Sequence, residues 1–427
     1  MSAKALRRTA WLGVICLAVG GGAPASQPPA VGIIDAGGSP AAPLHAVSRI
    51  AIDVREPVGI RRFQYPVAVE LTLPQAVARE TRFRLLRAGK PVLTQVRAAE
   101  AGESVARWWL DFPVDLLPYE SAVYELQYGP DVPPGPSPKQ GHRLISSAAE
   151  LRIANDPQIV WTVRRDLGGL LTSVRAGELE YLRTAPSGLL FRDSNGKPYA
   201  VGGGGGRPTK VSVTREGLLA VGLRFEFSEI LPELHATVDL TFPVFKTWVE
   251  VDCRIDDPHS MVATAEAKLD VNLDPPTRQT PTLVDFGTAG LVYLSLGPSQ
   301  QSQLRGDLGN WQVLRGMPDR LEPFVAGPRQ PDRYAPPEGW AHVMDRRHCL
   351  AMAVDHFGSA GEDRLGVAAD GHVELCRRFC AAKAPQSAVK RLRFWLHFVP
   401  YPPQVTAATS PQAMQNPIAT RVRVASP

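Results

Sequence analysis

RLRFWLHFVP, residues 391–400, decides the fold class of this chain. Four alternate positions in it are large and apolar: Leu392, Phe394, Leu396 and Phe398. The positions between them are polar or amphipathic: Arg391, Arg393, Trp395 and His397. Successive side chains of a β-strand point to opposite faces. The stretch therefore predicts an antiparallel strand with one face in a core and the other face directed outward.

The same alternation recurs along the chain. Residues 246–256, KTWVEVDCRID, place a second apolar row on one face: Val249, Val251, Cys253 and Ile255. Such segments are separated by many of the 40 prolines and 37 glycines, which favours many short strands over long helices. We therefore predict an all-β protein, in which a small N-terminal β-barrel-like domain precedes a large antiparallel β-sandwich.

Composition divides the chain into six stretches. In order they are a signal peptide (1–25), a linker (26–44), the N-terminal β-barrel-like domain (45–130), a Pro-rich linker (131–144), the central β-sandwich (145–405) and a tail leaving the sandwich (406–427). Residues 298–338 are poor in alternation and rich in Pro, Gly, Arg and Gln, so we expect a long loop there.

The first 25 residues have the pattern of a signal peptide. Lys4, Arg7 and Arg8 precede the short apolar core WLGVICLAVGGG, and Ala23-Pro24-Ala25 offers a cleavage point. We expect a secreted or periplasmic protein without membrane association after cleavage, because no later stretch is apolar for long enough. Cleavage removes three positive charges and lowers the net charge from +5 to +2. The remaining chain has no Lys/Arg-rich tract, which argues against nucleic acid as a partner.

Four cysteines remain after cleavage: Cys253, Cys349, Cys376 and Cys380. An oxidising compartment permits disulfides, and four cysteines allow three full pairings between which the sequence does not choose. No Cys/His spacing matches a zinc site. Asp256 and Asp257 follow a strand, but adjacent carboxylates at a turn are usually only solvated. The sequence thus predicts no metal and no cofactor, and it does not indicate calcium.

Two segments resemble a known family. In FRLLRAGKPVLTQVRAAEAGESVARWWLDFPVDLLPYESAVYELQYG (83–129), the matching residues are Gly89, Pro91, Val92, Gln95, Ser104, Val105, Arg107, Trp108, Asp111 and Phe112. The second segment, IANDPQIVWTVRRDLGGLLTSVRAGELEYL (153–182), looks like the opening of a galactose-mutarotase-like sandwich. GWAHVMDRRHCLAMAVDHF (339–357) resembles a late hairpin of that sandwich. Over residues 45–415 the chain resembles the exo-rhamnogalacturonan lyase-like (YetA-like) family.

The resemblance implies an N-terminal barrel, a central mutarotase-like supersandwich and cleavage of acidic plant polysaccharide by elimination. We find no counterpart of the family's third domain, a helical toroid, and expect a partner to supply it if the chain is active. The function implied is that of a secreted lyase-like protein acting on or binding uronate-containing polysaccharide. The alternative is a non-catalytic carbohydrate-binding or interaction module.

Elimination from a uronate needs a base beside the carboxylate and a cation that neutralises it. Three histidines are candidates for the base: His342, His356 and His397. Arginine pairs well with carboxylates, and tryptophan stacks on rings. The candidates for binding the sugar are Trp395, Arg391, Arg393, Trp311, Arg346 and Arg347.

Two of these groups have a structural alternative. Asp345-Arg346-Arg347-His348 is a four-residue connection between apolar stretches, which is typical of a solvent-exposed hairpin tip. Trp395 and His397 are expected about 7 Å apart on one side of their strand. If another sheet or the 298–338 loop covers that side, neither residue is free to meet a sugar.

Overall fold

The computed structural model describes most of the chain. The described ranges are 47–155, 159–183, 188–228, 230–231, 233–288, 291–307, 310–326, 338–359, 361–379, 389–400 and 411–424. All of them belong to one compact unit, Leu44–Pro427. The expected signal peptide and the linker that follows it lie outside the described residues.

Two sheets near the N-terminus form what we call the N-terminal sheet pair, a five-stranded sheet in the order β30-β1-β7-β3-β4 and a three-stranded sheet in the order β2-β6-β5. Their strands are β1 (Ser48–Arg55), β2 (Arg62–Ala78), β3 (Phe83–Arg87), β4 (Lys90–Val92), β5 (Gln95–Ala98), β6 (Ser104–Leu116), β7 (Ser121–Tyr128) and β30 (Ala419–Val424). Alternate residues of both sheets fill one shared core. Each sheet keeps free edges, so no closed barrel forms among the described strands. This corrects the expectation of a barrel here.

The remaining strands form the sandwich. A five-stranded sheet contains β8 (Arg143–Ser146), β9 (Glu150–Asn155), β10 (Ile159–Arg164), β11 (Ser173–Ala176) and β12 (Leu179–Glu180). An eight-stranded sheet contains β13 (Gly188–Arg192), β14 (Pro198–Val201), β19 (Thr264–Asp270), β22 (Gln301–Asp307), β23 (Asn310–Met317), β24 (Arg320–Ala326), β27 (Glu362–Ala368) and β28 (His372–Arg378). A nine-stranded sheet, in the order β15-β16-β17-β18-β29-β26-β25-β20-β21, contains β15 (Lys210–Arg215), β16 (Ala220–Phe227), β17 (His235–Pro243), β18 (Trp248–Asp256), β20 (Thr282–Gly287), β21 (Leu291–Leu296), β25 (Trp340–Met344), β26 (Cys349–Val354) and β29 (Lys390–Phe398).

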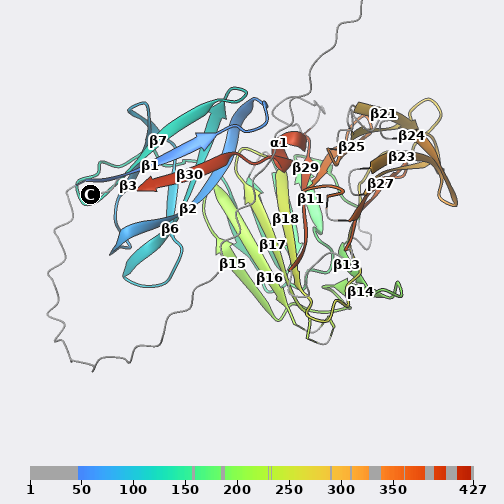
Figure 1. Cartoon of the computed structure of the whole chain (residues 1–427), viewed down its shortest axis with the longest axis horizontal. Coiled ribbons are helices and arrows are strands. Elements are labelled where there is room, and N and C mark those ends of the chain that lie inside the picture. Colours follow the sequence, from blue (N-terminus) through green and yellow to red (C-terminus); the bar gives the residue numbers. More distant parts are fainter. Residues whose placement is uncertain are drawn as a thin grey trace, which may run out of the picture. The chain divides into compact units, whose positions relative to one another are not determined.

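Strand β29 confirms the prediction made from its alternation. It pairs antiparallel with β18 on one side (Figure 1) and with β26 on the other. Its four alternate apolar side chains are fully buried in the sandwich core: Leu392, Phe394, Leu396 and Phe398. The matching row on β18 is buried in the same core, as the second alternating stretch predicted. The sandwich is therefore held by two inward-facing apolar faces, in the way that period-two patterning requires.

The other face of β29 is covered. Trp395 is only 3% exposed and His397 only 2% exposed. Trp395 shares an apolar cluster with Trp248, Ala351 and Ala353 of the same sheet and with side chains of β2 and β6. The small alanine side chains let the N-terminal sheet pair approach this face closely. Trp395 and His397 thus lie on an internal surface between two layers, which corrects the expectation that they face outward, whereas Arg391 and Arg393 of the same row keep some exposure.

The described part of the predicted tail, residues 411–424, belongs to the fold, which corrects the expectation that it leaves the sandwich. The helix α1 (Pro411–Gln415) packs on β25, β26 and β29, and β30 then pairs antiparallel with β1 (Figure 1). The buried guanidinium of Arg62 donates to the carbonyl oxygens of Ala413 at 2.7 Å and Asn416 at 2.6 Å. These residues, 411–424, are called the C-terminal segment below. They return from the sandwich to complete the first sheet.

Residues 301–307, 310–317 and 320–326 are strands, which corrects the long loop that we expected. β22, β23 and β24 form consecutive antiparallel pairs at one edge of the eight-stranded sheet. The inward positions of β22 include Ser302 and Gly306 beside Leu304, so too few large apolar residues mark the period. Trp311 of β23 is 9% exposed and belongs to the sandwich core, so it does not stand in an open loop as expected. The rest of the expected loop, residues 327–337, lies outside the described residues.

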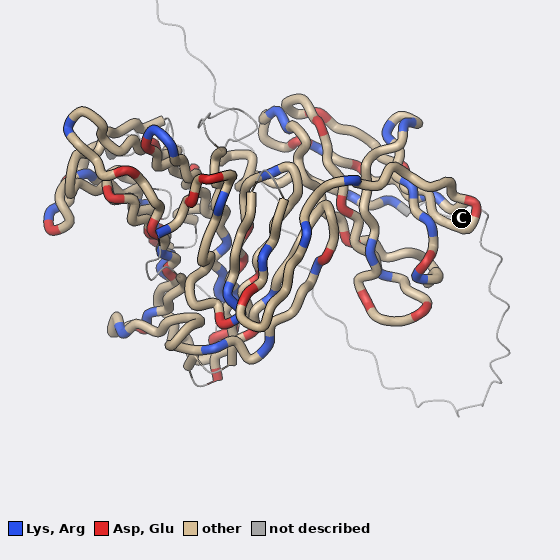
Figure 2. The backbone as a smooth tube through the Cα atoms, turned by 180° about the vertical axis from the view of Figure 1, so that it is seen from behind, with Lys and Arg blue, Asp and Glu red and all other residues tan. Residues whose placement is uncertain are grey.

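Three of the four candidate disulfide cysteines are buried free thiols: Cys253, Cys349 and Cys376. Cys380 lies outside the described residues, so no disulfide joins the cysteines that the structure describes. No described helix is long and apolar enough to cross a bilayer. Figure 2 shows Lys and Arg interspersed with Asp and Glu along the described chain, without a long tract of one sign.

Candidate functional site

A cavity of about 270 Å³ lies where the N-terminal sheet pair meets the outer face of the nine-stranded sheet. Residues of β2 and β6 form one wall, and residues of β16, β17, β18 and β29 form the other. Met414, Ile418 and Thr420 of the C-terminal segment close it along one side. We call this space the interface cavity. Its position fits the general rule that ligand sites form between packed layers or domains.

Three aromatic side chains line the interface cavity: Tyr65 of β2, Trp248 of β18 and Trp395 of β29. The rings of Tyr65 and Trp248 are 6.0 Å apart between centroids and tilted by 59°. All three residues are less than a tenth exposed. They meet here because outward positions of the two sheets face each other. Rigid rings of this kind present flat apolar surfaces to a ligand.

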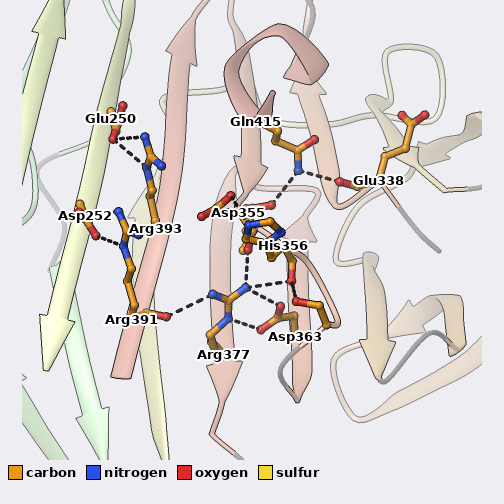
Figure 3. A network of polar contacts seen from close by, with 12 residues as sticks. Glu250, Asp252, Glu338, Asp355, His356, Asp363, Arg377, Arg391, Arg393 and Gln415 are labelled. Atoms are coloured by element: carbon orange, nitrogen blue, oxygen red, sulfur yellow. Dashed lines mark hydrogen bonds and ion pairs between the residues drawn. The ribbon is translucent and has the colours of Figure 1, made fainter. Parts of the chain in front are cut away.

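One ion pair in the wall joins neighbouring strands β18 and β29. The Nε and one Nη atom of Arg393 lie 2.8 and 2.7 Å from Oε1 of Glu250 (Figure 3). The other oxygen of Glu250 accepts the indole N–H of Trp395 at 3.3 Å. The guanidinium of Arg393 also lies over the Trp395 ring, 4.8 Å from its centroid. Both charged side chains are about a quarter exposed, so they remain within reach of a ligand.

A second charged group lies on the opposite wall. Asp111 of β6 is 3% exposed and accepts a hydrogen bond from Arg97, while Arg215 of β15 lies 3.7 Å away. Burial raises the pKa of Asp111 above its ordinary value, and the two arginines act against that rise. The guanidinium of Arg215 lies over Trp109, 4.3 Å from the ring centroid. The two walls therefore offer one carboxylate each, and each carboxylate has a basic partner.

The Tyr65 hydroxyl is a proton donor in this setting. Burial raises its pKa to about 12, with smaller opposing contributions from Arg62 and Arg393. The phenol therefore stays protonated near neutral pH and is unsuited to act as a base. Taken together, the interface cavity offers aromatic faces, two carboxylate acceptors and a hydroxyl, which is a set of groups that binds polyols.

The predicted binding residues are distributed over several places. Arg393 and Trp395 line the interface cavity. Arg391 does not line it, and its guanidinium pairs with both oxygens of Asp252 at 2.6 and 2.8 Å (Figure 3). Arg346 and Arg347 are exposed in the connection between β25 and β26, where Met344 pairs with Cys349. The hairpin prediction for this stretch is confirmed in the structure, although His348 at its end is buried.

The three histidines do not assemble into one site. His342 is 1% exposed, and its Nδ1 lies 2.7 Å from Asp285. His397 is packed edge-on against Trp248, with 5.7 Å between ring centroids. His356 is exposed in the turn after β26, with Nε2 3.8 Å from the Asp355 carboxylate. Asp355 and His356 come together here because the chain turns directly after β26.

One group of metal-ligand residue types occurs among the described residues: Glu266, Glu374 and Cys376 on the eight-stranded sheet. Three basic side chains already surround this group. Arg192 donates to Glu266 at 2.7 Å, Lys268 lies 3.4 Å from its other oxygen, and Arg364 donates to the thiol at 3.0 Å. These cations satisfy the carboxylates in place of a metal ion, so the residues do not fit a cation site.

Sequence reasoning missed four residues of the interface cavity: Tyr65, Trp248, Glu250 and Arg215. A signal existed for Glu250, which lies on the polar side of the alternating stretch 246–256. No local signal existed for Tyr65 or Arg215, because their roles depend on which layers pack together. Asp111 was among the residues that carried the family resemblance, without a role attached to it.

No protein-family model matches the sequence, and no curated protein matches it. Solved structures do match. A protein of glycosyl hydrolase family 38 from Enterococcus faecalis aligns with a TM-score of 0.54 at 10% identity, over 88% of this chain and 47% of that chain. An α-mannosidase from Enterococcus faecalis V583 aligns with a TM-score of 0.51 at 9% identity, over 88% and 46%. A galactose mutarotase related enzyme from Lactobacillus acidophilus aligns with a TM-score of 0.34 at 11% identity, over 60% and 97%.

The chain spans about half the length of the two glycosyl hydrolase structures. At identities near 10%, this likeness shows the fold alone. The expected fold class is confirmed: the protein is all-β, with a β-rich N-terminal part and a large antiparallel sandwich, and it shares this fold with carbohydrate-related enzymes.

Proposed function

We propose that this chain binds carbohydrate in the interface cavity and serves as the carbohydrate-binding, all-β part of a carbohydrate-active protein. The observation that carries the proposal is the convergence of Tyr65, Trp248 and Trp395 with the carboxylate of Glu250 in one cavity. Aromatic faces pack on the C–H faces of sugar rings, and a carboxylate accepts from their hydroxyl groups. The fold likeness to glycosyl hydrolases is in keeping with this role.

The size of the interface cavity suits a single sugar ring. Its volume of about 270 Å³ is near the lower end of ordinary ligand sites, which span roughly 300–1,000 Å³. A polysaccharide would therefore enter with one residue, not with an extended segment. Secretion or periplasmic export, and a separate domain or partner that supplies catalytic groups, belong to the same proposal.

A second candidate is β-elimination on a uronate polymer, as the family resemblance implies. The observation that favours it is the exposed His356, which lies beside Asp355 and is open to a substrate. The cation that elimination also needs is harder to assign, because Arg391 and Arg393 are both occupied by carboxylates. Absorbance of the unsaturated product, followed over a panel of pectic polymers with wild type and His356→Ala, tests this candidate directly.

The carbohydrate-binding proposal is tested by titrating the full chain with mono- and oligosaccharides while intrinsic tryptophan fluorescence is followed. Trp395→Phe should weaken binding by about 2- to 12-fold, which corresponds to a stacking contribution of roughly 0.5–1.5 kcal/mol. Trp311→Phe is the matched control, because Trp311 is a core tryptophan outside the cavity. If wild type binds no sugar, or if both variants bind as wild type does, the proposal is wrong.

A further inference from the structure

We propose that the interface cavity selects an uncharged hexose ring, and that Glu250 sets this preference by holding Arg393. This inference rests on the proposed carbohydrate function and names the class of sugar for the same site. It departs from the acidic polysaccharide that the sequence resemblance implies. The charges of the cavity wall, their partners and their burial support it.

The charges on the wall are balanced. The charged residues that line the cavity are Asp111, Arg215, Glu250 and Arg393, two of each sign. Recognition of a carboxylate favours a guanidinium whose N–H groups are free. In Arg393 two of the nitrogens that would serve are within 2.8 Å of Glu250. Arg215 likewise faces Asp111 and the ring of Trp109.

A sugar carboxylate would therefore meet two carboxylates whose arginine partners are already engaged. Arg97 and Arg215 both face Asp111, and Arg393 is held by Glu250. The side chains of Asp111 and Arg215 are 5% and 18% exposed, and those of Glu250 and Arg393 are 27% and 22% exposed. Solvent screens such groups less than it screens surface charges, so like-charge repulsion and desolvation both oppose a uronate. A neutral ring avoids both costs.

A neutral hydroxyl group matches the same wall. A hydroxyl donates to a carboxylate oxygen and accepts from an N–H or O–H group at the same time. The protonated Tyr65 hydroxyl is suited to be such a donor. Glu250 and Asp111 are suited to be the acceptors, from opposite walls. The pattern required of the ligand is thus several hydroxyl groups around an apolar ring face, without a charge.

The structure contains its own control for the role of Glu250. Asp252 and Arg391 form the same kind of ion pair between the same two strands (Figure 3). Each of them lies two residues from its counterpart, Asp252 after Glu250 and Arg391 before Arg393. Neither residue lines the interface cavity. Neutralising Glu250 releases Arg393 into the cavity, whereas neutralising Asp252 releases Arg391 and Arg254 outside it.

The experiment titrates the full chain with pairs of methyl glycosides that differ only at C6: glucose and glucuronate, galactose and galacturonate, mannose and mannuronate. In wild type, the neutral member of a pair that binds should bind at least ten-fold more tightly than the acid. Glu250→Gln should reduce that ratio at least ten-fold or reverse it. Asp252→Asn should leave the ratio unchanged. Arg393→Gln should gain no affinity for the acid, since it leaves no free cation.

The outcomes separate this inference from the proposed function. Tighter binding of a uronate by wild type overturns the inference and leaves carbohydrate binding standing. An unchanged ratio in a folded Glu250→Gln protein also overturns it, and thermal unfolding shows whether the variant is folded. If that variant does not fold, the ratios of neutral to acidic affinity of wild type over the three pairs decide whether the inference stands. Binding of no member of any pair overturns the proposed function and the inference together.

Discussion

At the scale of single residues, the carboxylate of Asp345 organises the hairpin tip between β25 and β26. One oxygen accepts the backbone N–H groups of Arg347 and His348, each at 2.6 Å. The other accepts the backbone N–H of Asp274 at 2.6 Å and lies 3.2 Å from the His348 ring. Burial acts to raise the pKa of Asp345, but these hydrogen bonds outweigh it and lower the pKa to about 2.

Asp345→Ala should therefore destabilise the protein by roughly 1–3 kcal/mol, because it removes the charged acceptor of three backbone N–H groups. Arg346→Ala and Arg347→Ala are the controls and should change stability by less than about 0.5 kcal/mol, since both side chains are exposed. The stabilisation due to Asp345 is complete above its unfolded pKa near 3.8 and is lost as pH falls toward about 2. Urea unfolding of the three variants measures these differences. Equal losses in all three would contradict this account.

At the scale of elements, the connection into β8 brings a histidine into the sandwich. His142 is 2% exposed, packs edge-on against Trp161 of β10 and donates its backbone N–H to the carbonyl of Leu218. Burial lowers the pKa of its ring from 6.5 to about 4, so the folded state holds the ring neutral. The unfolded chain binds a proton near pH 6.5, and folding then has to expel it.

We expect this histidine to make stability pH-dependent. Its unfavourable contribution is absent above about pH 6.5 and grows as pH falls toward 4, reaching up to about 2 kcal/mol at pH 5. His142→Phe should remove that part of the slope while keeping an aromatic contact with Trp161. The check is urea unfolding of wild type and variant at pH 7.5 and pH 5. Parallel pH profiles of the two proteins would show that the ring is protonated in the folded state.

Elements also show how far the sequence predicts the structure. The alternation of 391–398 identified the strand and its inward face, because period two is a local property. Which part of the protein covers the outward face is not a local property. The sequence around Trp395 is the same whether solvent or another sheet lies over it. β22 was missed since its inward positions include Ser302 and Gly306, which hide the period. Glu250 and Arg393 are each visible in the sequence, but their pairing depends on the register of β18 against β29.

At the scale of the whole molecule, one buried ion pair links the N-terminal sheet pair to the C-terminal segment. Arg62 and Glu56 have fully buried side chains, 2.9 Å apart, and Arg62 also donates to two carbonyl oxygens of that segment. Glu56 in turn accepts the backbone N–H groups of Val58, Gly59 and Tyr119. Gln415 fastens the same segment to the sandwich, by donating to the carbonyl of Val354 at 2.7 Å.

Arg62→Met should destabilise the protein by roughly 3–5 kcal/mol, because it leaves the Glu56 carboxylate buried without its partner. It should also free β30, so that trypsin cleaves at Arg421 and Arg423 faster than in wild type. Arg62→Met combined with Glu56→Gln should recover part of the lost stability. Chemical unfolding and timed proteolysis measure both effects. Wild-type rates of cleavage in a destabilised Arg62→Met protein would mean that other contacts hold the segment.

Because β30 pairs with β1, one edge of β1 stays unpaired during synthesis until β30 has been made. β7 is complete at Tyr128, but β30 begins at Ala419, 291 residues later. At elongation rates of roughly 5–20 residues per second, the ribosome needs about 15 to 60 s to cover that distance. Throughout this interval one edge of β1 has no partner strand, and an open edge invites pairing with other chains. The sheet that contains β1 is therefore among the last to be completed. A nascent chain halted before Ala419 exposes a strand edge that a chaperone or an aggregate can bind.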